Sequence, residues 1–188
     1  MSIVFRHHLE QIISLTDQEF DYILSHFHAK KYRKHQFVVQ EGNTVDHDYF
    51  VVSGLLKAYY VNEDGKEHIL QFAMENWWVT DYQAFTTRTK AILNIDCIEN
   101  VELLAISFDD KQKLCTEYHK MEHFFRIKTT SGYVALQQRV LSLLNNDAQS
   151  RHQQLFRLYP SIFQRVPKSV IASYLGVSRE TLSRLSLG

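Results

Sequence analysis

The chain has 188 residues, of which 45% are hydrophobic and 13% aromatic, so its composition excludes a disordered protein and allows one medium domain or two small ones. No stretch approaches the roughly 18–20 apolar residues of a membrane span, and the apolar run at the start of the chain is too short for a secretory signal. Two isolated cysteines fit a reducing compartment, so we expect a cytoplasmic protein with no membrane partner. The net charge of zero hides an asymmetry: residues 151–188 carry six basic side chains against one acidic (+5), and residues 1–150 carry 15 against 20 (−5). A basic tail favours a polyanion partner, although arginines that solvate a small helical domain would give the same balance.

Residues 9–28 are predicted to be helical. Thr16 can cap the stretch DQEFDYILSHF, and Glu19 follows three residues later, as in a capping box. Apolar residues then recur at helical spacing. His26 and His28 have no third metal ligand nearby, so we interpret them as surface histidines.

From residue 35 to residue 108, short β-rich runs alternate with turn residues. Strands at about ten-residue spacing predict an antiparallel sandwich or barrel. Residues 62–65, Asn-Glu-Asp-Gly, predict a hairpin turn in which Gly65 takes a positive φ. The aromatic segment ENWWVTDYQAF interrupts the strands as a short helix or a loop. The runs are HQFVVQ, DYFVVSG, LLKAYYV, KEHILQFA, AILNIDCIE and VELLAISF.

Residues 109–145 are predicted to form one long helix, since they contain no Pro and only one Gly. Two neighbouring apolar stripes run along it, and two stripes can cover the β-rich domain and a partner helix at once. From residue 118 to residue 145 such a helix spans about 40 Å. We expect a dimerisation helix. A helix buried within one domain is the alternative, and the polar Ser131 and Gln138 within one stripe weaken the coiled-coil interpretation.

The C-terminal residues predict two short helices joined by a turn. A helical stretch ends at Pro160, and Pro167 then suits the start of a helix with an apolar face. Gly176 can end that helix in the left-handed conformation, and Ser178 can cap a second helix, ETLSRL. Two helices joined in this way form a helix-turn-helix. The whole chain is therefore predicted to be α+β, with an effector-type β-roll at 1–108, the dimerisation helix at 109–145 and the helix-turn-helix domain at 146–188.

In such a motif the start of the second helix meets the major groove of double-stranded DNA. Arg179 and Arg184 suit guanine, and Glu180 can accept from cytosine, so these three are predicted to read bases. Polar and basic side chains around them are predicted to contact phosphates and set position. These are Ser178, Thr181, Ser183, Lys168 and Arg165.

Three segments carry a family resemblance. IASYLGVSRETLSRL resembles the DNA-binding helices of the catabolite-activator/Fnr (Crp/Fnr) family of bacterial transcription regulators. GNTVDHDYFVVSGLLKAYY resembles the start of the family's β-roll, and QRVLSLL resembles the end of its dimerisation helix. The resemblance implies a homodimeric regulator with a cyclic-nucleotide-binding-type roll. It also implies that the residues at Arg179, Glu180 and Arg184 read bases.

The sequence departs from the family's nucleotide signature, a Gly-Glu pair followed later by Arg-Ser or Arg-Thr. Thr80-Asp81 stands in place of Gly-Glu, and Ala91-Ile92 in place of Arg-Ser, so the arginine that pairs with the cyclic phosphate is missing. We therefore expect no binding of cyclic AMP, because a nearby lysine lacks the two-pronged donor geometry. Asp81 either contacts a ligand hydroxyl or caps the local turn, and the aromatic residues either line a pocket or fill the roll. The candidate pocket for an unknown small-molecule effector comprises Phe72, Trp78, Asp81, Tyr82, Arg88 and Lys90.

Three further functions are weighed against the regulator. Two cysteines cannot supply the roughly four ligands of an Fnr-type iron–sulfur cluster, and no cofactor is expected. The sequence stops at Gly188, just after the second helix, so the protein is alternatively a small-molecule-binding roll with weak or no DNA binding. A cupin-type enzyme would need Asp46, His47, Asp48 and His68 as ligands, whose spacing fits no metal pattern, and no enzyme activity is expected.

Overall fold

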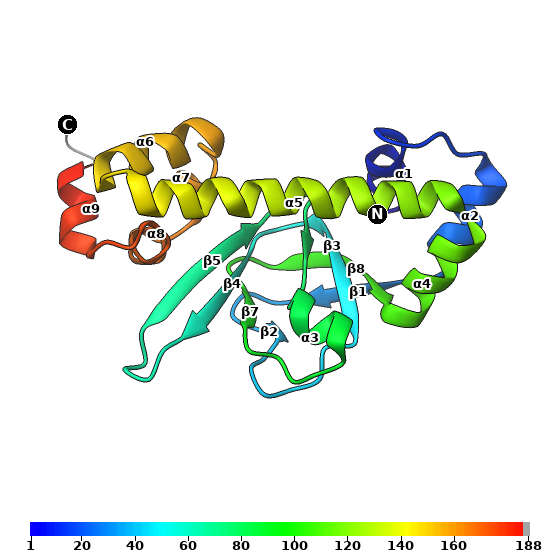
Figure 1. Ribbon diagram of the computed structural model, residues 1–188, viewed down its shortest axis with the longest axis horizontal. Coiled ribbons are helices and arrows are strands. Elements are labelled where there is room, and N and C mark those ends of the chain that lie inside the picture. The colour runs from blue at the N-terminus through cyan, green and yellow to red at the C-terminus, as the bar shows by residue number, and fades with distance from the viewer. Residues whose placement is uncertain (186–188) are drawn as a thin grey trace.

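The computed structural model describes residues 1–185 and has the predicted α+β architecture, in which two antiparallel sheets form a roll beneath a long helix (Figure 1). One sheet has the strand order β1-β8-β3-β6 and the other has the order β2-β7-β4-β5. All six predicted β-rich runs contain a strand, which confirms the alternation from residue 35 onward. The strands are β1 (Phe27–Tyr32), β2 (Phe37–Val39), β3 (His47–Ser53), β4 (Leu56–Val61), β5 (Glu67–Ala73), β6 (Trp78–Val79), β7 (Asn94–Cys97) and β8 (Val101–Ser107).

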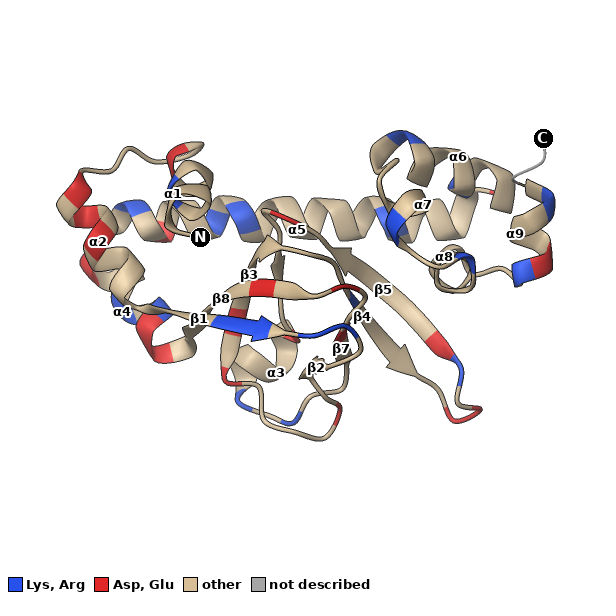
Figure 2. Cartoon of the chain, turned by 180° about the vertical axis from the view of Figure 1, so that it is seen from behind, with Lys and Arg blue, Asp and Glu red and all other residues tan. Residues whose placement is uncertain are grey.

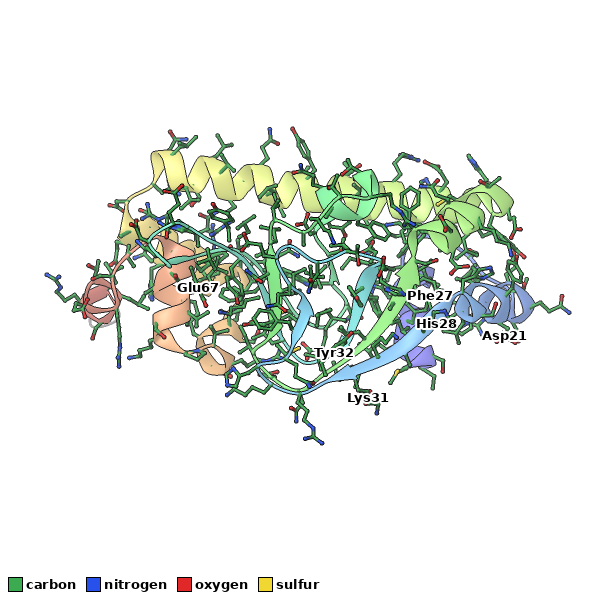
Figure 3. All side chains as sticks on the ribbon, turned by 90° about the horizontal axis from the view of Figure 1, so that it is seen from below. Asp21, Phe27, His28, Lys31, Tyr32 and Glu67 are labelled. Carbon is green, nitrogen blue, oxygen red and sulfur yellow. The ribbon has the colours of Figure 1, made fainter. Side chains whose placement is uncertain are left out.

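Strand β1 was not predicted, because its sequence FHAKKY has almost no apolar alternation. It pairs with β8 along its whole length, from Phe27 opposite Ile106 to Tyr32 opposite Val101. Its other edge is open, and Lys31 lies on the outside of the roll (Figure 3). Charged side chains on an edge strand discourage pairing with other chains. Pairing with β8 therefore makes this segment a strand, and the lysines of β1 discourage its open edge from pairing with another chain.

The interior of the roll is filled by its own side chains. Alternate residues of both sheets, such as Val51, Leu56 and Leu103, are fully buried. At Gly54 (φ +94°) a Cβ atom would lie 2.4 Å from the carbonyl oxygen of Asn100, so only glycine allows this approach. The predicted hairpin between β4 and β5 is also present, with Gly65 at φ +75°.

The N-terminal helices are shorter than predicted. The predicted helix over 9–28 is replaced by α1 (Ser2–Glu10) and α2 (Asp17–Ser25), which are separated by non-helical residues 11–16, and α2 ends just before β1 begins at Phe27. The capping box of Thr16 and Glu19 is confirmed. These helices, with α4 (Phe108–Glu117), cover the outer face of the β1-β8-β3-β6 sheet.

The single helix predicted over 109–145 is interrupted at Tyr118, which has an extended backbone (φ −124°, ψ 97°). Tyr118 packs against the ring of Tyr22 in the N-terminal core, and this tertiary contact outweighs the helical pattern. The long helix is therefore α5 (His119–Asn145), whose 27 residues span about 40 Å. It runs the length of the molecule, from α1 and α2 at one end to the C-terminal helices at the other (Figure 1).

The C-terminal helices pack on the outer face of the β2-β7-β4-β5 sheet. Leu155, Ile162 and Ile171 share one buried cluster with Ile69 and Phe72 of β5. The roll and these helices are thus joined by a continuous apolar core. Gly188, the last residue of the sequence, lies in residues 186–188, outside the described residues. The remaining helices are α3 (Tyr82–Thr87), α6 (Ala148–Leu158), α7 (Ile162–Arg165), α8 (Lys168–Leu175) and α9 (Arg179–Leu185).

None of the helices within residues 1–185 is both long enough and apolar enough to cross a membrane.

Candidate functional site

The turn between α8 and α9 is built from local signals that the sequence contains. Gly176 ends α8 in the left-handed conformation (φ 69°, ψ 33°). Val177 N donates to the carbonyl oxygen of Ala172 at 3.0 Å. Ser178 then caps α9, since its Oγ accepts from the backbone N–H of Thr181 at 3.2 Å. The two helices are therefore held at a fixed angle by three consecutive residues.

Helix α9 has one buried face and one free face. Leu182 is 2% exposed and packs inward, whereas the side chains of Arg179, Glu180 and Arg184 are exposed. The backbone N–H of Glu180 and the hydroxyl of Ser178 hold the pKa of Glu180 below its usual value, so this side chain is an anion at neutral pH. Figure 2 shows these charges at the C-terminal end of the molecule. Two cations and one anion thus stand on a surface that can meet a ligand.

The residues predicted to contact phosphate fall into two groups. Ser178, Thr181, Ser183 and Lys168 lie on or beside α9 and the start of α8, where each is exposed or half-buried. Arg165 is different, because its guanidinium already binds two carboxylates of the roll. In this arrangement Arg165 cannot serve as a free phosphate contact, and we correct that prediction.

Arg165 clamps the C-terminal helices to the roll. Its Nη1 and Nη2 each lie 2.9 Å from an oxygen of Glu75, and its Nε and Nη2 lie 3.0 and 2.6 Å from the oxygens of Glu99. These hydrogen bonds, first to Glu99 and then to Glu75, raise the pKa of Arg165. Such two-pronged pairing has both directionality and strength. The carboxylates come from segments 66 and 90 residues away, so the sequence contained no sign of the pairing.

Asp81 occupies the segment where the resemblance placed the nucleotide signature. It is 1% exposed and caps α3, its Oδ1 accepting from Ala84 N at 3.1 Å. Its Oδ2 accepts from the backbone N–H groups of Ile92 at 2.9 Å and Leu93 at 3.1 Å. The capping interpretation of Asp81 is therefore confirmed. Its carboxylate therefore also occupies the backbone N–H of Ile92, in the Ala91-Ile92 segment that stands in place of the family's Arg-Ser pair.

The six residues of the predicted effector pocket do not converge. Phe72 faces the C-terminal helices, with its ring 4.9 Å from that of Tyr174. Trp78 faces the N-terminal helices, and its Nε1 donates to His8 at 3.2 Å. The two residues therefore lie on the outer faces of different sheets, and the alternation of strands alone did not show which face each would take.

The other pocket candidates lie around α3. Tyr82 begins the helix and is exposed, and Arg88 ends it at φ 58° with its guanidinium 5.4 Å from the ring centre of Phe108. Lys90 is exposed beside Thr44, with which it forms an isolated β-bridge. Among the described residues, no contact joins Arg88 or Lys90 to Asp81.

A buried ion pair that the sequence did not predict joins the roll to the helices. Lys111 Nζ on α4 donates to Asp48 Oδ2 on β3 at 2.7 Å. The ammonium lies 4.4 Å from the ring centre of Phe125 and about 6 Å from those of Trp78 and Tyr82. The pair spans 63 residues of sequence, and neither partner stands in a recognisable motif. Asp48, one of the four residues that a cupin-type metal site would need, is therefore paired with a lysine.

Within residues 1–185, no group of three or more His, Cys, Asp or Glu side chains could hold a metal ion. The cupin interpretation fails on this geometry, since its candidates His47 and His68 lie on strands of different sheets.

Comparison with known proteins agrees with this architecture. Residues 29–118 match the family model of the cyclic nucleotide-binding domain. The structure resembles the c-di-GMP-responsive global regulator CLP of Xanthomonas campestris, with a TM-score of 0.70 at 18% identity over 88% of this chain and 87% of that one. It also resembles FixK2 of Bradyrhizobium japonicum, with a TM-score of 0.71 at 18% identity over 86% and 83% of the two chains.

A third structure comes from Eubacterium rectale and is assigned to the Crp/Fnr family. Its TM-score is 0.69 at 14% identity, over 91% of this chain and 82% of that one. The chain has the Crp/Fnr-like fold. No curated protein sequence shows a significant match. In this Crp/Fnr-like fold, α9 leaves Arg179, Glu180 and Arg184 exposed, and Asp81 lies in the matched cyclic nucleotide-binding domain.

Proposed function

We propose that the protein is a sequence-specific DNA-binding transcription regulator, and not an enzyme, that acts in the cytoplasm. The observation that carries the proposal is the free face of α9. Arg179, Glu180 and Arg184 project from a helix whose opposite side is anchored through Leu182. An arginine fork matches the O6 and N7 atoms of guanine, and a carboxylate accepts from the amino group of cytosine. Ser178, Thr181, Ser183 and Lys168 would contact the phosphates beside those bases.

The regulator would act as a homodimer through the second half of α5. In the first half Met121, Phe124 and Phe125 are buried against the roll, whereas beyond Thr129 most apolar side chains are exposed. A second copy of the same surface is the natural partner for an exposed apolar helix, since closed two-fold dimers bury identical faces. The exposed residues are Tyr133, Val134, Leu136, Val140, Leu141, Leu143 and Leu144.

The roll of this regulator would not bind cyclic AMP. The backbone N–H groups of Ile92 and Leu93 are already bonded to Asp81, and no arginine stands at Ala91-Ile92 to pair with a phosphate. A nucleotide would have to displace a buried carboxylate that accepts three backbone hydrogen bonds. Any effector would therefore use chemistry other than that of the family's signature, and it would enter elsewhere than at Asp81.

The decisive experiment is selection of bound sequences from random double-stranded DNA by the full chain. We expect a two-fold symmetric site with half-sites about 34 Å apart, or a multiple of that distance. Binding to the selected site should weaken steeply as salt rises, because each neutralised phosphate releases counterions. Recovery of no enriched sequence at low salt, from folded protein, would reject the proposal. It would favour a small-molecule-binding roll that does not grip DNA.

A further inference from the structure

Three parts of the molecule meet at one side chain, Arg139 in the exposed half of α5. Its Nη2 donates to the carbonyl oxygen of Ile69 on β5 at 2.6 Å and to that of Tyr174 on α8 at 2.9 Å. Its guanidinium carbon lies 3.5 Å from the ring centre of Tyr174. Arg139 thus joins the long helix, the roll and the C-terminal helix pair through a single planar group.

The charge of Arg139 is not balanced by an acidic side chain within residues 1–185. Burial lowers its pKa, yet an arginine remains charged at any working pH. The cation is instead stabilised by the negative end of the α8 dipole and by the face of the Tyr174 ring. A half-buried cation whose described partners are carbonyl oxygens and a ring points to a positioning role.

A second arginine completes the same arrangement. Arg151 on α6 donates from Nε to the carbonyl oxygen of Leu175 at 3.1 Å and from Nη1 to that of Asn146 at 2.6 Å. The last two carbonyl groups of α8 therefore each accept from an arginine outside that helix, where a helix otherwise leaves its acceptors unpaired. The end of α8 is tied to α5 directly and to the loop after α5 through α6.

The tied end of α8 is the point that decides the direction of α9. Gly176 follows Leu175 at once, and α9 begins three residues later at Arg179. Glu67 lies beside the same helices (Figure 3), and its carbonyl oxygen accepts from Ser173 Oγ at 2.6 Å. Whatever fixes α8 on α5 and β5 therefore also fixes where the exposed face of α9 points.

We propose that Arg139 is a positioning residue that sets the spacing and orientation of the two α9 helices in the dimer. The inference rests on the proposed function, in which α5 forms the dimer and α9 reads DNA. Arg139 would join the dimer axis to the recognition helix without touching DNA. Its loss would leave each α9 able to bind one half-site but would relax the distance between the two.

Arginine is required at this position for a geometric reason. One terminal nitrogen of the guanidinium supplies both hydrogen bonds, while the planar group stacks on Tyr174. A lysine ammonium has donors for both carbonyl oxygens but lacks the planar group that lies over the Tyr174 ring, and a glutamine carries no charge. Arg139→Lys should therefore restore less than half of the preference for half-site spacing that Arg139→Gln loses. Arg126→Gln is the matched control, because Arg126 is exposed on α5 and its contacts with Glu122 and His123 stay within that helix.

The test compares DNA sites that differ only in spacing. Affinities of the full chain are measured by fluorescence anisotropy for the selected site, for sites with one base pair added or removed between half-sites, and for a single half-site. Wild type and Arg126→Gln should prefer the selected spacing by about tenfold or more, and Arg139→Gln by about threefold or less, with half-site affinity unchanged within about twofold. A variant that keeps the full spacing preference overturns the inference, as does one that loses half-site affinity to the same degree.

A second measurement needs no DNA. Spin labels are attached to the exposed α5 and α9 positions of the double variant Thr130→Cys and Ser183→Cys, with Cys115 changed to serine. Arg139→Gln should broaden the distribution of distances between the labels, whereas Arg126→Gln should leave it as narrow as in the parent. An unchanged distribution overturns the positioning role. If wild type binds no DNA at all, the proposed function fails, and the label distances still decide whether Arg139 fixes α9.

Discussion

Two short helices in this molecule begin in the same way and lie in opposite surroundings. Asp81 caps α3 and Ser178 caps α9, each through a side-chain oxygen that accepts a backbone N–H three residues on. Around Asp81 the remaining oxygen binds Ile92 and Leu93, so the polar group is enclosed. Around Ser178 the residues that follow remain exposed. A polar residue at a helix start is therefore accessible to a ligand only where the fold leaves the side chains beside it exposed.

The largest expected effect comes from changing the exposed face of α9. Changing Arg179 and Arg184 together to alanine removes two base contacts, each worth about 1–3 kcal/mol, so affinity for the selected DNA should fall about 30-fold or more. The measurement is fluorescence anisotropy at fixed salt. The thermal midpoint should stay unchanged, since both side chains are exposed. Arg126→Ala is the control on α5, and equal loss in that variant would indicate a general charge effect.

The second expected effect concerns the dimer that would bring two α9 helices together. Leu136 and Val140 are 52% and 46% exposed, one turn apart on α5. Changing both to glutamate should convert the dimer to a monomer, because two charges would be buried in an apolar contact. Sedimentation equilibrium measures the change. Since neither residue is buried within one chain, the secondary structure seen by circular dichroism should persist, and a dimer that survives would contradict the α5 interface.

The third prediction concerns the enclosed cap of α3, Asp81. Asp81→Ala should lower the free energy of unfolding by about 2–4 kcal/mol, through loss of the α3 cap and of the acceptor for the Ile92 and Leu93 N–H groups. Asp81→Asn should lose less, because an amide oxygen can still cap α3. Urea unfolding at neutral pH compares the two. An alanine variant as stable as wild type would show that Asp81 does not hold this segment closed, and would reopen it as an effector site.

The smallest expected effect concerns the clamp between the two regions. Arg165→Gln should lower the free energy of unfolding by about 1 kcal/mol at pH 7, since solvent screens a partly exposed ion pair. Burial raises the pKa of Glu75, but hydrogen bonds from Arg165 and from backbone N–H groups outweigh it, and the net pKa is lowered. A lowered pKa means that the pair stabilises above about pH 4.3, the usual glutamate value, and less as pH falls through the folded pKa.

The difference between wild type and Arg165→Gln should therefore shrink between pH 5 and pH 3. Urea unfolding of both proteins across that range checks it, with Arg157→Gln on the exposed side of α6 as the control. A difference that stays constant with pH would show that carboxylate pairing is not what Arg165 contributes.

Short-range patterns predicted much of this fold. The capping box at Thr16, the hairpin at Gly65, the left-handed end at Gly176 and the cap at Ser178 are all present. The two predictions of a single helix, over 9–28 and over 109–145, were wrong where a residue distant in sequence contacts the segment. β1 exists because β8 pairs with it, and α4 is separated from α5 because Tyr118 packs against Tyr22.

By itself the sequence determined the order of most helices and strands, several of their caps and turns, and which face of α9 is polar, because caps, turns and amphipathic spacing act within about four residues. Only the tertiary structure decided which polar groups are occupied. Lys111 binds Asp48 across 63 residues, Arg139 binds Ile69 across 70, and Arg165 binds Glu75 across 90. These pairs form where sheets and helices pack together, and no local pattern encodes a partner that packing alone brings within reach.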